Sequence, residues 1–144
     1  MALLAYLLLA VGCAQFSSES VTDEVALAFD DLAQQFYRRI DDAERANLAV
    51  ARLEAVEQFV QRSKVELQQR RNAFTALNAN YDSTMNDFDE FIQTELVLQA
   101  TRQKTAIGLF KALRDTMTAA EWAQTASARD ETMAVALSHV HGLE

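Results

Sequence analysis

The segment Val25-Ala-Leu-Ala-Phe29-Asp-Asp-Leu32-Ala-Gln-Gln-Phe36 indicates the fold class most clearly, because its large apolar residues recur in steps of four, three and four. That spacing brings them onto one face of an α-helix. The pattern continues less regularly at Ala43, Ala46, Val50, Leu53, Val56, Val60, Leu67 and Phe74. It therefore predicts a long amphipathic helical arm of the coiled-coil type, which buries one stripe of side chains.

Proline and glycine, the residues that punctuate strands and tight turns, are nearly absent. The chain has 144 residues, with no proline and three glycines. Good helix formers such as alanine, leucine, glutamine and glutamate are abundant. We expect an all-α protein with one domain's worth of sequence.

A second apolar run follows an interruption. The segment Leu77-Asn-Ala-Asn-Tyr-Asp-Ser83 is rich in side chains that favour turns over helix. Apolar or seam-type residues then recur at helical spacing: Tyr81, Met85, Phe88, Ile92, Leu96, Gln103, Ile107, Phe110, Leu113 and Met117. We expect a hairpin turn near 78–83, folded at Asn80, with Asp82 or Ser83 capping the second arm.

Each arm carries a further break. The pattern Thr118-Ala-Ala-Glu121 is typical of a capping box, so it predicts a break near 117–118 and a last helix that runs to about His141. Asp41–Asn47 is a candidate break in the first arm. The predicted architecture is a long antiparallel helical hairpin or an elongated three- to four-helix coiled-coil-like bundle, in a single all-α helical domain over 22–144.

The charge pattern argues against one class of partner and favours an orientation of the arms. A net charge of −8 excludes nucleic acid as an expected partner. Residues 72–101 carry five acids and no base, whereas 102–114 carry four bases and no acid. Folding at Asn80 places Arg70 and Arg71 opposite Asp89 and Glu90, although exposed pairs contribute only about 0–1 kcal/mol each.

The N-terminal segment differs in composition from the rest of the chain. Met1-Ala-Leu-Leu-Ala-Tyr-Leu-Leu-Leu-Ala-Val-Gly-Cys13 carries no charged side chain and ends at the only cysteine. Its apolar core is shorter than the roughly 20 residues that cross a bilayer, and it fits the apolar region of a secretion signal, about 7–15 residues long. Ala10 and Gly12 supply small side chains before Cys13.

Leu9-Ala10-Val11-Gly12-Cys13 resembles the signal-peptide ending of bacterial lipoproteins, with Ala10 where leucine is usual. The resemblance covers about a tenth of the chain. It implies that the signal peptide, 1–12, is cleaved, that Cys13 is the lipid-attachment site bearing acyl chains such as palmitate, and that 13–21 forms a lipidated tether. The implied location is the periplasmic face of a Gram-negative cell envelope. Ala14, which stands where an aspartate would retain the protein in the inner membrane, favours the outer membrane.

Two other interpretations of the N-terminus stay open. An ordinary secretion signal would be cut after Ala14, because Gly12 and Ala14 are both small. Alternatively, the apolar segment stays uncleaved, as a helix of an intracellular coiled-coil protein in which Cys13 is a buried thiol.

Catalytic patterns are missing from the sequence. It has no glycine-rich phosphate loop, no paired-histidine zinc motif and no nucleophile-elbow serine. On a helix His139 and His141 point about 200° apart, so they do not share a metal ion. We expect a protein that is not an enzyme, with no catalytic residue, no metal site and no cofactor.

Because the sequence has no catalytic pattern, we expect a binding function. Phe59 and Phe91 lie beside the main apolar stripes and are candidates for contact with a partner. A basic cluster offers the further candidates Arg62, Lys64, Arg70 and Arg71. We expect a membrane-anchored scaffold, adaptor or regulatory module that binds another envelope protein or forms a homo-oligomer. The alternative is a periplasmic chaperone or stress-sensor-like helical hairpin protein.

Overall fold

The computed structural model describes residues 18–141, and over that range it is an all-α helical bundle, as the composition predicted. Five helices follow one another: α1 (Ser18–Arg39), α2 (Ala43–Ala79), α3 (Met85–Arg114), α4 (Ala119–Gln124) and α5 (Ala126–His141). The predicted signal peptide, 1–12, and Cys13 lie outside the described residues. The predicted tether, 13–21, overlaps the structure, because α1 begins at Ser18.

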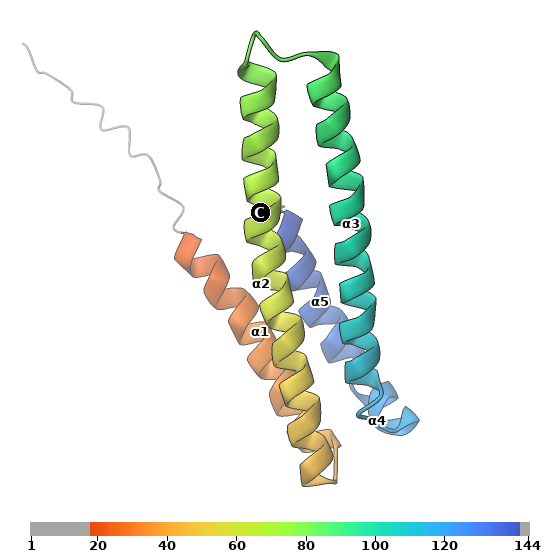
Figure 1. Ribbon diagram of the computed structural model, residues 1–144. Coiled ribbons are helices and arrows are strands. Elements are labelled where there is room, and N and C mark those ends of the chain that lie inside the picture. The colour runs from red at the N-terminus through yellow and green to blue at the C-terminus, as the bar shows by residue number, and fades with distance from the viewer. Residues whose placement is uncertain (1–17, 142–144) are drawn as a thin grey trace, which may run out of the picture.

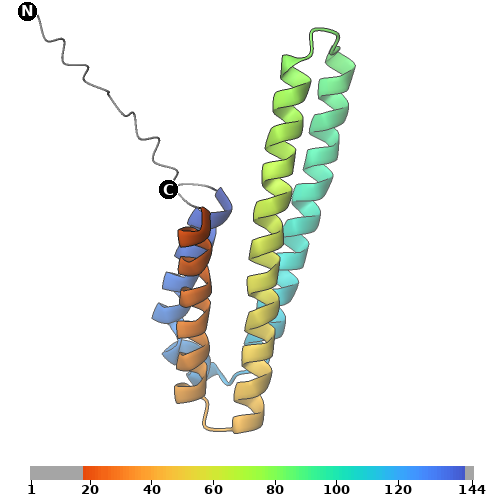
Figure 2. The ribbon, with the colours of Figure 1, turned by 90° about the vertical axis from the view of Figure 1, so that its left-hand side faces the viewer.

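The helices form two layers of unequal length (Figures 1 and 2). α1 and α5 make one layer, while α2 and α3 make the other as an antiparallel hairpin. The α1–α5 layer packs on the half of α2 that follows Asp42. The rest of the hairpin projects beyond it, and we call residues 72–94 the arm. The start of α1 and the end of α5 lie at the same end of their layer, on the side of the arm.

The core lies between α1, α5 and the first half of α2. Its α1 members are the residues of the opening pattern, Val25, Phe29, Leu32 and Phe36, and Ile40 joins them directly after the helix. Its α2 members are Ala46, Ala49, Leu53, Val56 and Val60. Burying a side chain as large as Phe36 contributes about 1.5–3 kcal/mol, so the stability of the bundle resides mainly here.

A buried threonine ties α5 to α1. The hydroxyl of Thr132 donates to the carbonyl oxygens of Ala28, at 3.1 Å, and Ala128, at 2.8 Å. Because a buried hydroxyl costs stability unless it is hydrogen-bonded, this contact fixes how the two helices align.

Capping explains where the second and third helices begin. Asp42 caps α2, since its carboxylate accepts from the backbone N–H of Arg45 at 2.8 Å. α3 is capped by Thr84, and not by Asp82 or Ser83 as we expected. The reason is a capping box, because Asp87 accepts from the Thr84 N–H at 2.7 Å and Thr84 accepts in return. Ser83 instead donates to the Leu77 carbonyl within the turn.

The C-terminal region contains two helices where we expected one. Thr118 and Glu121 form the predicted capping box at the start of α4. α4 then ends at Gln124 and is capped by Thr125, which is buried and whose hydroxyl donates to the carbonyls of Glu121 and Trp122. A side chain that bonds nearby carbonyls competes with regular helix, and it allows the chain to turn before α5.

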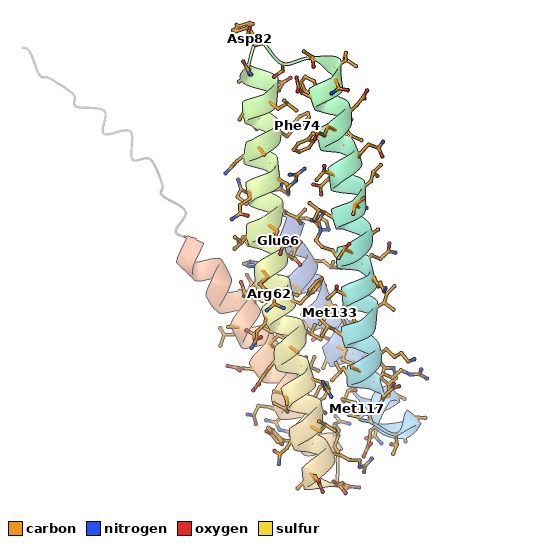
Figure 3. The ribbon with its side chains drawn as sticks, viewed as in Figure 1. Arg62, Glu66, Phe74, Asp82, Met117 and Met133 are labelled. Atoms are coloured by element: carbon orange, nitrogen blue, oxygen red, sulfur yellow. The ribbon has the colours of Figure 1, made fainter. Side chains whose placement is uncertain are left out.

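An aromatic seam joins the two helices of the arm, and polar residues precede the arm on α2. Phe74 packs edge-on against Phe88, with ring centroids 6.3 Å apart, and lies 5.6 Å from Phe91; its position between the two helices is visible in Figure 3. On α2, the last buried residue is Ser63. Lys64 and Arg71 follow on α2 and contact the end of α5, because Lys64 approaches His139 and Arg71 donates to the His141 carbonyl.

Candidate binding groove

An apolar groove with a volume of about 650 Å³ lies between α2, α3 and α5. α2 forms its floor with Val56, Val60 and Leu67. The two walls come from α3, through Ala106 and Phe110 among others, and from α5, through Met133, Leu137 and Val140. Met133 lies in the space between the α2 and α3 ribbons in Figure 3.

The groove forms because α3 and α5 pack against different helices. α3 packs chiefly against α2, whereas α5 packs against α1 and α2. Only one residue of α3, Leu113, is fully buried, and it lies near the end where the helices converge. Further along, the wall of α3 presents the exposed amides of Gln99 and Gln103. The result is an apolar floor with a polar rim, which is the usual composition of a binding groove.

An ion network borders one end of the groove. Glu95 accepts from Arg70 Nε at 2.7 Å and from Arg102 Nη2 at 2.6 Å. Burial opposes ionisation of Glu95, but the hydrogen bonds and charges of Arg102 and Arg70 outweigh it and lower its pKa. Since two arginines share one carboxylate, the network keeps a net positive charge.

Arg70 holds the seam between α2 and α3. Its guanidinium carbon lies 4.2 Å from the centroid of the Phe91 ring, a cation–π contact. Its Nη2 atom is buried without a hydrogen-bond partner among the described residues. The expected pairing of Arg70 and Arg71 with Asp89 and Glu90 is wrong for Arg70, which bonds Glu95. The turn spans Asn80–Thr84, so its centre lies beyond Asn80. This shifts the register of α3 relative to α2.

His139 connects the end of α5 to α2. It is only 1% exposed, and its Nδ1 lies 3.2 Å from Lys64 Nζ, while its Nε2 lies 3.3 Å from Gln61 Oε1. A lysine ammonium donates and does not accept, so in these contacts Nδ1 accepts from Lys64 and Nε2 donates to Gln61. Lys64 and Gln61 thus hold the end of α5 against α2.

The six predicted partner-binding residues do not share one surface. Phe59 is half-buried and lines the groove. Phe91 and Arg70 belong to the α2–α3 seam, and Lys64 binds His139. Arg71 donates to the His141 carbonyl at 2.9 Å, so it too contacts the end of α5. Arg62 is exposed on the face of α2 that points toward the viewer in Figure 3, away from α5.

Three large apolar groove residues on α5 are not among the binding residues predicted from the sequence. Met133, Leu137 and Val140 follow steps of four and three, which is the signal of an apolar face. Leu137 is 59% exposed although it is large and apolar. The pattern was readable, but whether it faced the core or a groove depends on where α3 lies.

Two other kinds of feature, a metal centre and a membrane-spanning helix, are absent from the described range. Residues 18–141 contain no group of three or more histidine, cysteine or acidic side chains placed to hold a metal ion. None of their helices has the length and apolar character needed to span a bilayer. Comparison of the chain with protein-family models, curated proteins and solved structures found no match.

Proposed function

We propose that this protein is a non-catalytic binding module, which acts as a scaffold, adaptor or regulatory subunit for another protein of the cell envelope. In this proposal Cys13 carries the lipid anchor at the periplasmic face of the outer membrane. The support for the anchor is the residue pattern of 1–13, with its uncharged apolar run and small residues before the cysteine. The support for binding is the groove.

The groove is the observation that carries the proposal. It combines an apolar floor with one wall from each helical layer, and it opens between α3 and α5, which do not pack closely on each other. Amphipathic helices bind such grooves through apolar anchors spaced three and four residues apart. Phe59, Phe110 and Leu137 offer the apolar contacts, while the amides of Gln99 and Gln103 offer hydrogen bonds at the rim.

Paired variants on α5 test this proposal. Leu137 lines the groove, whereas the next residue, Ser138, is exposed and is not a groove residue. We expect Leu137→Glu to lose a partner that copurifies with the membrane-extracted protein, because a charge in an apolar contact is costly. Ser138→Glu adds the same charge and should keep the partner. Equal recovery with both variants would contradict binding in the groove.

A periplasmic chaperone is the second candidate, and the arm is the observation that favours it. Large apolar side chains are exposed there, among them Phe74, Tyr81, Met85 and Ile92. Chaperones of this kind bind unfolded clients through exposed apolar surface. Suppression of client aggregation that disappears in a Tyr81→Ser/Met85→Ser variant would favour this candidate over the adaptor.

A further inference from the structure

A line of large apolar side chains is exposed along α3. Met85 is 76% exposed, Ile92 49%, Leu96 54% and Ile107 61%. They are separated by 7, 4 and 11 residues, each close to a whole number of turns at about 3.6 residues per turn. The four residues therefore lie on one side of α3, and we call them the α3 stripe.

The α3 stripe is a different surface from the groove. None of its four residues lines the groove, and none packs against the core of the bundle. Apolar residues of this size, aligned along one helix, are typical of an interface with another protein. The stripe runs through both halves of α3, so an occupant must follow the helix lengthwise.

The charges of α3 are divided between its two halves. From Met85 to Thr101 the helix has four acids and no base, and from Arg102 to Arg114 it has four bases and no acid. The helix dipole accounts for charges in the first and last turns, here Asp87, Lys111 and Arg114. Asp89, Glu90 and Lys104 lie further inside, where that effect has faded.

We propose that α3 pairs in antiparallel orientation with α3 of a second copy of this chain. A two-fold axis midway between Gln99 and Ala100 places Ile92 opposite Ile107 of the second copy. The same axis places the acidic residues 87–95 of each copy against residues 104–112 of the other, which include Lys104 and Lys111. A parallel pair would bring like charges together, so the charge pattern selects the antiparallel, closed dimer.

Charge reversal tests the pairing. The full chain with Cys13→Ala should be a dimer by sedimentation over a micromolar concentration series. Asp89→Lys/Glu90→Lys and Lys104→Glu/Lys111→Glu should each raise the dimer dissociation constant at least about tenfold, and combining all four changes should largely restore it. Arg38→Glu/Arg52→Glu, on exposed positions of α1 and α2, matches the second variant in charge and should leave the dimer intact.

Engineered cysteines test the orientation independently of stability. In the same Cys13→Ala chain, Ile92→Cys/Ile107→Cys should form disulfide-linked dimers on oxidation, whereas each single variant should not. Within one chain the two positions lie about 22 Å apart, too far for a bond. A parent monomeric throughout the series, no restoration in the fourfold variant, equal weakening by the control, or efficient linkage by Ile92→Cys alone would overturn the proposal.

Discussion

Arg45 of α2 and Glu121 of α4 form an ion pair across 76 residues of sequence, with Nη1 2.9 Å from Oε2. The same carboxylate oxygen accepts from the Thr118 N–H at 2.7 Å. One side chain therefore caps α4 and attaches the connection between α3 and α5 to the start of α2. This contact fixes the end of the bundle at which both layers converge.

Loss of this carboxylate should destabilise the fold. We expect Glu121→Ala to lower the free energy of unfolding by about 2 kcal/mol, because a cap and a charge-assisted hydrogen bond disappear together. Urea unfolding at neutral pH measures the loss. Glu131→Ala, at an exposed position of α5, serves as the control and should cost less than about 0.5 kcal/mol.

The effect of Glu121 should depend on pH. The Thr118 N–H bond, aided by Arg45, lowers the pKa of Glu121 below its ordinary 4.5 despite burial. A lowered pKa in the folded state adds stability above the unfolded pKa, and this stability is lost as pH falls through the folded value. The difference between the parent and Glu121→Ala should thus shrink in acid. An unchanged difference well below pH 4.5 would contradict the assignment.

The pKa of Glu57 is shifted in the opposite direction, so its effect on stability should have the opposite pH dependence. Burial, followed by the charges of Asp30 and Glu54, raises its pKa above 4.5. The stability linked to its protonated form is complete below about pH 4.5 and is lost as pH rises through the folded pKa. Glu57→Gln should therefore raise the free energy of unfolding at pH 7 by about 0.5 kcal/mol, with little gain in acid. An equal gain from Glu66→Gln, on the exposed face of α2, would speak against this cause.

Stability should differ sharply between the bundle and the arm. Phe36→Ala removes a fully buried ring and should cost about 3–5 kcal/mol. Phe74 is 45% exposed, so Phe74→Ala should cost only about 1 kcal/mol, mostly from its ring contacts. Thermal unfolding of the two variants measures this contrast, and similar losses would show that the arm is part of the cooperative core.

The sequence predicted the class of fold better than the pairing of its helices. The steps from Val25 to Phe36 identify a buried face because every member lies in the core. The similar run on α3 is mostly exposed, and only Leu113 is fully buried. Periodicity finds an apolar face, but which helix covers that face depends on long-range packing, and α5 pairs with α1 and α2 instead of α3.

Only part of the candidate site was predictable, because sequence periodicity does not show which helices pack together. Phe59 lines the groove, but Phe91 lies beneath Arg70 in the seam. The register of α3 against α2 depends on the turn Asn80–Thr84, in which the Asp82 N–H donates to Asn80 Oδ1. Sequence spacing shows that a turn occurs, yet a shift of a few residues in its centre changes which side chains meet.

Processing at Cys13 makes a separate prediction. Expressed in a Gram-negative host, the chain should appear in the membrane fraction with a mass that begins at Cys13 and includes acyl chains. Cys13→Ala should abolish the acylation. A soluble, unprocessed form that begins at Met1 would contradict the lipid anchor and favour the intracellular alternative.

The most direct test of the binding function is photo-crosslinking in cells from single positions on α5 and α3. A photoreactive residue at Leu137 or Ala106 samples the groove, and one at Ser138 samples the outer face of α5. We predict a discrete adduct with one other envelope protein from Leu137 and Ala106, and none from Ser138. Adducts of equal yield from all three positions, or none from the groove positions, would contradict the groove as a protein-binding surface.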